Sequence, residues 1–254
     1  MVIPLRYLIS LWTLIPVFVQ GQAMPPPEVT VQFTVFSRKR LEGLCYLPTK
    51  LSQPMSLRFF TQNKSERYRY TGSADVAFYA VEDWARYAQV GVVAVPLVKP
   101  LPRPVAVATL PSGMREALLL FIPLPETQPD GIKFLVLPVD DDPARFPVGH
   151  IAVVNATGRH YTGQVGRKVL DLPQGVGSNV SATGPVDFRL ACFDGGQWVF
   201  AGHHFLNVGP RTRVRLVLFP ATAPTGVGPV IRALVDEPHD KTGMLTAARL
   251  APGK

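Results

Sequence analysis

The chain is short of cysteine, of acidic residues and of helical pattern, and each shortage excludes something. Its 254 residues include two cysteines, so at most one disulfide can form. Eighteen Asp and Glu residues, several of them bunched at expected strand ends, provide no pair of carboxylates that can be assigned to glycan hydrolysis. No G-x-S-x-G motif is present, so the nucleophile elbow of a hydrolase is missing. Helical periodicity is confined to 81–90 and 241–250, where we expect a turn or two and a short terminal helix or frayed tail.

The two cysteines, Cys45 and Cys192, lie in the apolar strand-like segments GLCYL and RLACF. They are 147 positions apart (192 minus 45) and fall in what we interpret as different domains. A disulfide between the two cysteines is the alternative interpretation, because export from the cytosol would permit it. We expect two separate buried thiols that act as small hydrophobic side chains.

The first 23 residues have the layout of a secretory signal peptide. A start with one positive charge precedes an apolar run from Tyr7 to Val19, and Gly21-Gln22-Ala23 supplies small residues for cleavage. The run is short for a membrane span, which needs about 20 residues. We therefore expect cleavage after Ala23, an exported chain in the periplasm or outside the cell, and no span after cleavage. An uncleaved N-terminal anchor is the alternative.

Apolar residues make up 47% of the chain and charged residues 17%, which favours a packed core over disorder. The 26 prolines and 21 glycines are scattered between short apolar runs, as in sandwiches and barrels. Val29, Val31, Phe33 and Val35 alternate with polar residues and predict a half-buried strand. Further strands are expected at 44–47, 55–60, 67–70, 76–81, 92–98, 105–110, 117–122, 132–139, 150–154, 161–165, 168–172, 186–193, 197–201, 213–219 and 230–235. Asp194-Gly195-Gly196 predicts a hairpin turn.

An internal repeat is indicated by segments that recur in the same order. Leu118–Pro123 is echoed by Leu216–Pro220, 131–143 by 228–238, and Thr71-Gly72 by Thr183-Gly184. We therefore predict an all-β protein with two antiparallel β-sandwich domains, at 28–143 and 147–238, joined at 146–149 and followed by a tail at 239–254. Both copies end in acidic residues and a proline, which we interpret as surface turns.

The formal net charge is +8 and the pI about 9.7, which would suit anionic polysaccharide, acidic lipid or nucleic acid. The basic residues are dispersed, however, and Arg38-Lys39-Arg40 is the one tight cluster. Arg211, Arg213 and Arg215 alternate along one strand, and we expect a solvated sheet face there rather than a phosphate track. No nucleic-acid partner is expected.

Candidate catalytic and metal-binding residues do not combine into a site. Ser178 lies in a glycine-flanked segment that we expect to be a flexible loop. His203 and His204 could join His150, His160 or His239 at a metal, but neighbours on a strand point to opposite faces, so we expect a solvated pair at a strand end. Asp140–Asp142 could bind calcium, yet a plain acidic turn is favoured. We assign no catalytic, metal-binding or cofactor-binding residue and no cofactor.

Three further patterns have two interpretations each. The segment PLVKPLPRP at 96–104 could be a polyproline II ligand, but an edge segment that cannot pair is favoured. A group of aromatic side chains could stack on a sugar ligand, although we expect these side chains to be buried in the core. The group consists of Tyr68, Tyr70, Phe78, Tyr79 and Trp84. The sequons at Asn63, Asn155 and Asn179 would matter only in a eukaryotic secretory pathway.

The segments HIAVVNATGRHYTGQVGRKVLDLPQG and RTRVRLVLFP resemble uncharacterised exported bacterial all-β proteins with tandem sandwich-like domains. The resemblance implies a sandwich of immunoglobulin or transthyretin type in an envelope compartment, and it implies no activity. The leading hypothesis is a non-enzymatic envelope module, binding or structural, whose partner is an envelope protein reached by edge-strand pairing or an anionic envelope polymer. The alternative is an envelope glycan-acting hydrolase with unidentified carboxylates.

Overall fold

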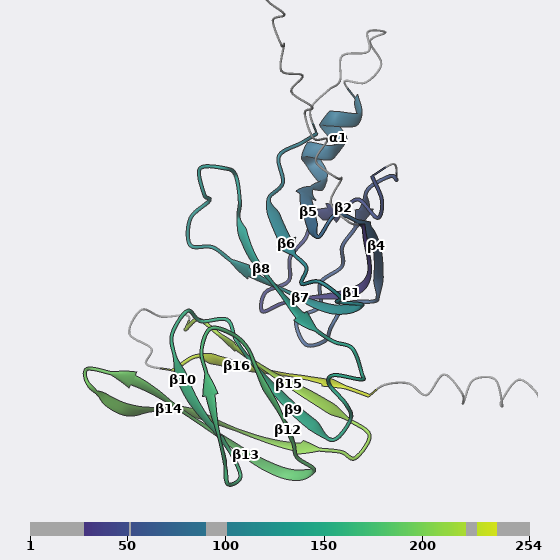
Figure 1. The fold of residues 1–254 in the computed structure, drawn as a ribbon. Helices are drawn as coiled ribbons and strands as arrows, with labels where there is room; N and C mark the ends of the chain where they lie inside the picture. The colour runs from purple at the N-terminus through teal and green to yellow at the C-terminus, as the bar shows by residue number, and fades with distance from the viewer. Residues whose placement is uncertain (1–27, 51, 90–100, 222–227, 238–254) are drawn as a thin grey trace, which may run out of the picture.

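The computed structural model describes residues 28–50, 52–89, 101–221 and 228–237. Within these ranges the chain is all-β, as predicted, with sixteen strands and one helix (Figure 1). The expected signal peptide at 1–23, the expected strand at 92–98, most of the proline-rich segment and the expected tail at 239–254 with His239 lie wholly or partly outside the described residues.

The N-terminal half of the described chain, 29–140, forms two four-stranded sheets. The N-outer sheet has the order β3-β2-β5-β6 and the N-inner sheet the order β4-β1-β7-β8. Helix α1 (Val81–Gln89) follows β5, where the sequence predicted a turn or two of helix. The strands are β1 (Val29–Ser37), β2 (Leu44–Tyr46), β3 (Met55–Ser56), β4 (Tyr68–Gly72), β5 (Asp75–Ala80), β6 (Ala106–Thr109), β7 (Glu116–Pro123) and β8 (Phe134–Asp140).

The C-terminal half, 150–236, also forms two four-stranded sheets among its described residues. The C-inner sheet has the order β12-β9-β15-β16 and the C-outer sheet the order β11-β10-β13-β14. The strands are β9 (His150–Asn155), β10 (Tyr161–Val165), β11 (Lys168–Leu172), β12 (Gly175–Ser181), β13 (Gly184–Asp194), β14 (Gln197–Val208), β15 (Arg213–Phe219) and β16 (Val230–Asp236).

The two halves have the same strand order, since β9 to β16 take the places of β1 to β8. In each inner sheet the first and seventh strands pair in parallel, β1 with β7 and β9 with β15. The prediction of antiparallel sheets is therefore wrong at these two pairs, although the other pairs of the described strands are antiparallel. The shared order is an observation on topology, and descent from an internal duplication stays a prediction.

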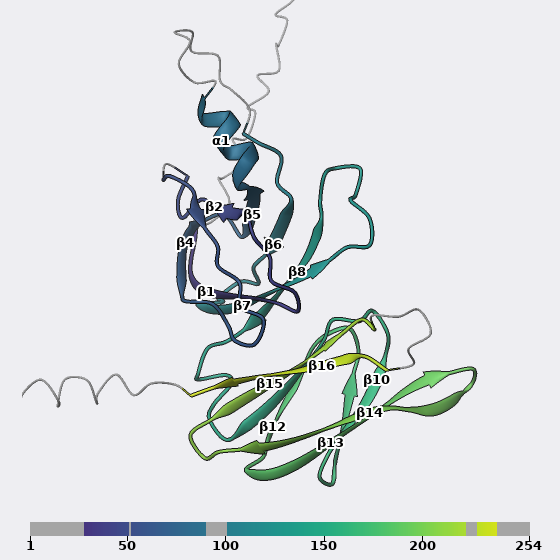
Figure 2. The same cartoon turned by 180° about the vertical axis from the view of Figure 1, so that it is seen from behind.

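The four sheets stack in the order N-outer, N-inner, C-inner and C-outer, with an apolar layer between each neighbouring pair (Figures 1 and 2). The middle layer joins the halves and contains Phe36 and Leu118 from one side and Val217 and Phe219 from the other. The Phe36 and Phe219 ring centroids are 6.1 Å apart. Because both inner sheets are covered on both faces, their central strands need apolar residues at consecutive positions.

This double burial accounts for the runs that the sequence repeats. In β7, Leu118 and Leu120 face the C-terminal half, whereas Leu119 and Phe121 face the core of the N-terminal half. All seven residues of β15 are buried. The similarity of the two runs therefore has a packing cause, whatever its origin.

Three segments differ from their predicted structure. Gly175–Ser181, expected to be a flexible loop, is strand β12, which pairs with β9 across a register shift. The strand expected at 55–60 is confined to Met55–Ser56. β14 continues to Val208, well beyond the predicted end at Ala201. The hairpin turn at Gly195-Gly196 is confirmed, and both glycines have positive φ, of 56° and 86°.

Candidate functional site

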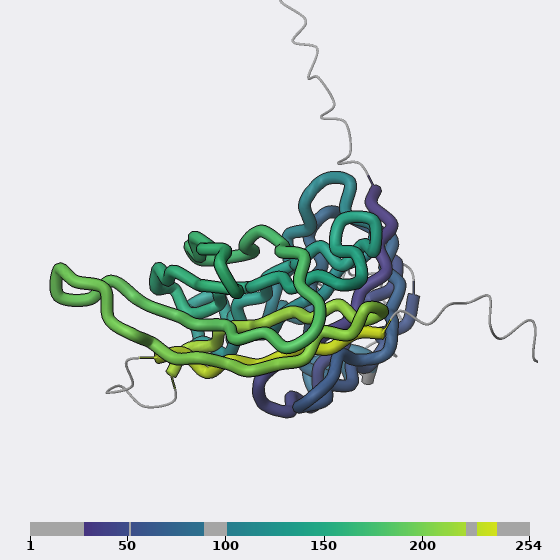
Figure 3. The backbone as a smooth tube through the Cα atoms, turned by 90° about the horizontal axis from the view of Figure 1, so that it is seen from below, coloured from purple at the N-terminus to yellow at the C-terminus, as the bar shows by residue number. Residues whose placement is uncertain are grey.

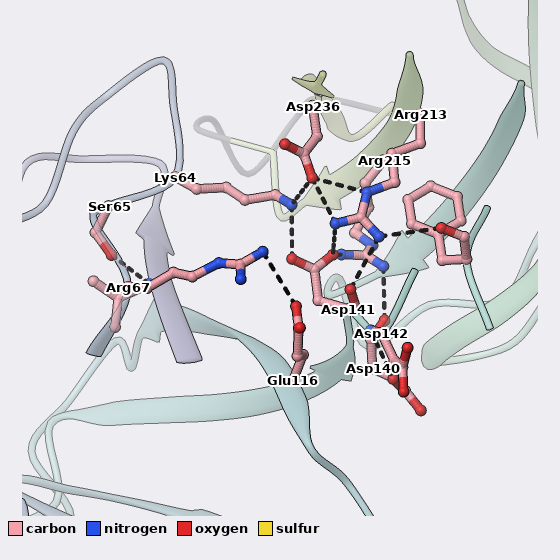
Figure 4. Close-up of polar contacts among 12 residues, drawn as sticks. Lys64, Ser65, Arg67, Glu116, Asp140, Asp141, Asp142, Arg213, Arg215 and Asp236 are labelled. Carbon is pink, nitrogen blue, oxygen red and sulfur yellow. Dashed lines mark hydrogen bonds and ion pairs between the residues drawn. The ribbon is translucent and has the colours of Figure 1, made fainter. Parts of the chain in front are cut away.

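Two arginines on β15 are buried between the halves of the molecule (Figure 4). Arg213 is 1% exposed and Arg215 2% exposed, so the prediction of a solvated arginine face is wrong. Arg211 precedes the strand and is exposed, as expected. β15 alternates in the usual way, but the face that carries its arginines packs against the N-terminal half, in line with Val217 and Phe219.

The two guanidinium groups bind carboxylates from both halves. Arg215 Nη1 donates to Oδ1 of Asp141, the residue just after β8, at 2.6 Å. Arg213 Nε donates to Oδ2 of Asp236, the last residue of β16, at 2.8 Å. Lys64, in the loop between β3 and β4, donates from Nζ to Asp141 Oδ2 at 2.8 Å and to Asp236 Oδ2 at 3.1 Å. We call these five residues the ion cluster, and it carries three positive and two negative formal charges.

The segment that joins the halves completes the surroundings of the cluster. Arg213 Nη1 donates to the carbonyl oxygens of Asp141 and Phe146, at 3.0 and 3.1 Å. The Phe146 ring lies under both guanidinium groups, with Arg215 Cζ 4.6 Å and Arg213 Cζ 5.4 Å from its centroid. Stacking of this kind favours the cations in a desolvated place. Phe146, the first residue of the predicted joint at 146–149, is therefore part of the packed interface, whereas Val148 is exposed.

Asp141 is buried, which overturns the prediction of a plain acidic surface turn at Asp140–Asp142. Burial raises the pKa of the Asp141 carboxyl, but the charges of Lys64, Arg215 and Arg213 outweigh burial and leave that pKa below its ordinary value. The pKa of Asp236 is lowered in the same way, against burial, chiefly by Lys64 and Arg213. Burial lowers the pKa of Arg215, and Asp141 opposes that shift.

These carboxylates are therefore ionised at neutral pH and occupied by cations, and neither is poised to donate a proton to a substrate. A buried charge network with most of its partners in place fixes one geometry of the two halves. Arg215 Nε is a buried donor without a hydrogen-bond partner among the described residues. The arrangement suits a structural lock between the halves.

A second feature, on the outer face of the C-outer sheet, is exposed and aromatic. Phe193, Trp198, Phe200 and Phe205 expose between 54 and 69% of their surface. Phe193 lies opposite Trp198 in the β13–β14 register, and their ring centroids are 5.5 Å apart. His203 lies between Phe200 and Phe205 at 6.1 and 5.0 Å. We call these five residues the aromatic face.

The hairpin that carries the aromatic face extends beyond the rest of the sheet (Figure 3). Pairing of β13 with β10 ends at Cys192, so the tip from Phe193 to Trp198 has no neighbouring strand among the described residues. A bulge interrupts the hairpin, because Leu190 lies opposite Gly202 and Ala191 opposite Phe200. Gly202 has φ of 145°, which favours glycine. The bulge returns His203 and Phe205 to the same face as Trp198 and Phe200.

The remaining candidates are not brought together. His203 and His204 lie within β14, not at a strand end, and they differ in exposure as neighbours on a strand should. Burial, and then the nearby His203, lower the pKa of His204. No group of three His, Cys, Asp or Glu side chains among the described residues could hold a metal ion. Ser178 lies in β12 and is exposed.

Two sequence predictions about the core are confirmed. Cys45 and Cys192 are separate, buried and unpaired. Of the predicted aromatic group, Tyr68, Tyr70, Phe78 and Tyr79 are buried, whereas Trp84 on α1 is half-buried and stacks beside Tyr79 with ring centroids 5.4 Å apart. Three features were not predicted from the sequence: the ion pairs of Lys64, the contact of Phe146 with the arginines, and the aromatic face. The alternating positions of Trp198 and Phe200 indicated one aromatic side of the strand. The bulge shifts the alternation, so the sequence pattern does not show that Phe205 lies on the same side.

No protein-family model matches the chain, and no curated protein matches it either. In the part of the chain that the structure describes, no helix has the length and apolar character to cross a bilayer.

Proposed function

We propose that the protein is an exported, non-enzymatic envelope module that binds a protein partner through the aromatic face. The observation that carries this proposal is the group of four large apolar rings, each more than half exposed, on one face of a projecting hairpin. Tryptophan and other aromatic side chains contribute much of the free energy of protein–protein binding. Exposed apolar patches on soluble proteins commonly mark such surfaces.

The long pairing of β13 with β14 supports this proposal, because it holds the hairpin in one register. Binding through a preorganised surface loses less conformational entropy than binding through a flexible one. The aromatic face lies on the sheet farthest from the N-terminal half, so the lock and the binding surface are separate. The anionic polymer that the basic composition suggested is not favoured, because Asp187 and Asp194 accompany Arg189 and Arg159 as ion pairs beside the aromatic face.

The alternative of a glycan-acting hydrolase receives no support from the site. The two carboxylates that converge, Asp141 and Asp236, share the ammonium group of Lys64. Retaining and inverting hydrolases need one protonated and one free carboxyl group across the bond to be cleaved. We therefore keep the non-enzymatic interpretation.

For the type of sandwich, we propose the transthyretin type over the immunoglobulin type. An immunoglobulin domain places its first two strands in the same sheet. In this chain β1 and β2, like β9 and β10, belong to different sheets. The signal peptide at 1–23 and the tandem domains at 28–143 and 147–238 complete the proposal.

Affinity capture tests the binding proposal. The mature chain, immobilised, is incubated with the envelope fraction of its own cells, in parallel with a variant that combines Trp198→Ala and Phe200→Ala. Phe60→Ala, at a ring 49% exposed in the other half, is the matched control. We expect a partner retained by the natural chain and the control to be lost from the double variant. Equal retention by all three chains would exclude the aromatic face as the binding surface.

A further inference from the structure

We propose that the free edge of β14 pairs with β14 of a second copy, in antiparallel register about a twofold axis. This edge is distinct from the aromatic face, because the edge presents backbone groups and the face presents side chains. The inference therefore goes beyond the proposed function and does not depend on it.

β14 is the least protected edge among the described strands. The strand orders give eight edge strands, and β14, with 12 residues, is the longest of them in the described chain. It contains no Lys, Arg, Asp, Glu or Pro. Proteins usually protect an exposed edge with charge, with proline or by keeping it short.

The other described edges have such protection. Two are short, since β3 has two residues and β6 has four. β12 has seven residues and contains a register shift. The remaining four contain charged residues: β4 has Arg69, β8 has Asp140 as well as Pro138, β11 has Lys168 and Asp171, and β16 has Arg232 and Asp236.

The open part of the edge is the stretch His203–Val208. The bulge at Ala201-Gly202 interrupts the strand. The backbone of Gly228 lies against Ala201. A Cβ atom added to Gly228 would lie only 2.0 Å from the carbonyl oxygen of Ala201. On the far side of the bulge, β14 meets no further strand among the described residues.

A second copy is the occupant that the charges favour. In an antiparallel pair, like charges directly opposite each other destabilise the pairing. Since β14 has no formal charge at neutral pH, it can meet its own copy in any register without such a contact. Twofold pairing is also closed, because each copy uses its own β14 edge and neither β14 edge is left free for a third copy.

Pairing would also place two aromatic faces on one continuous eight-stranded sheet, which would present a partner with two binding surfaces at once.

Sedimentation equilibrium of the mature chain tests the proposal. We expect a monomer–dimer equilibrium that strengthens as salt is added, because each mature copy carries a formal charge of +7 (the +8 of the full chain minus Arg6) and salt screens their repulsion. A variant with His203→Lys and Asn207→Lys should weaken the dimer about tenfold or more through like charges across the twofold axis. A matching variant with His203→Asp and Asn207→Asp should be weakened similarly, and a 1:1 mixture of the two should recover the dimer.

The neutral control combines His203→Gln with Asn207→Gln and should dimerise like the natural chain. A natural chain that stays monomeric at the highest soluble concentration would overturn the proposal. A dimer unaffected by the lysine pair, or lysine and aspartate variants that do not recover when mixed, would also overturn it. None of these results bears on the capture experiment above, in which His203 and Asn207 are unchanged.

Discussion

Arg215 and Asp141 are 74 positions apart in the chain, and their side chains meet at 2.6 Å inside the molecule. The contact joins β15 of the C-terminal half to the residue that follows β8 of the N-terminal half. Both side chains are almost completely buried, so each depends on the other to offset the loss of water.

Removal of one partner should therefore cost much of the stability. Asp141→Ala leaves Arg215 without its carboxylate, and we expect a loss of about 3–5 kcal/mol in the free energy of unfolding. Denaturation in urea measures this loss. Arg145→Ala, which breaks an exposed pair with Asp140, is the control and should cost about 1 kcal/mol or less. Equal losses in the two variants would show that the buried pair does not hold the halves together.

Acid should weaken the same contact. The folded-state pKa of Asp141 lies below its ordinary value, as does that of Asp236. Their stabilisation is therefore fully present above the ordinary carboxyl pKa, near pH 4, and is lost as the pH falls through the lowered folded values. We expect the melting temperature to fall below about pH 4 in the natural chain, and to fall less steeply in Asp141→Asn. Parallel curves for the two chains would contradict the assignment.

The thiols offer a test of the core that is independent of the ion cluster. Cys45 and Cys192 are free and buried, and burial raises the pKa of the Cys45 thiol. A thiol reagent should therefore label neither cysteine in the folded protein and both in denaturant, without any reductant. If reductant were required for labelling in denaturant, the two cysteines would be paired.

The expected signal peptide can be checked by mass. Expression of the full chain in a secreting host should yield a mature protein that begins at Met24, because small residues precede that position. Intact-mass measurement of the exported fraction gives the N-terminus directly. A chain recovered from the cytosol with residues 1–23 attached would remove the proposal of export.

Local pattern was enough to predict most of the strands. Alternation predicted β1, apolar runs predicted β7 and β15, and glycines predicted the turn between β13 and β14. β12 was missed because Gly175 and Gly177 weaken a strand pattern. Its place was set by pairing with β9, which lies about 25 residues earlier.

The ion cluster could not be predicted in the same way. Alternation showed that Arg213 and Arg215 share a face, but not what that face meets. The available signal was that Val217 and Phe219 continue the same face, which a solvated surface would not favour. Lys64 and Asp141 carry no periodic signal, because both lie outside strands and are positioned by the packing of the two halves.

The middle apolar layer also constrains how the protein can be dissected. A fragment cut between β8 and β9 would leave Phe36 and Leu118 uncovered on one piece, and Phe219 on the other, together with an Arg215 that has lost its carboxylate. Neither piece would behave as its half does in the whole protein, since each would tend to aggregate through the apolar surface that the cut exposes. Crystallisation, expression and interaction trials are therefore best designed around a polypeptide that contains both halves.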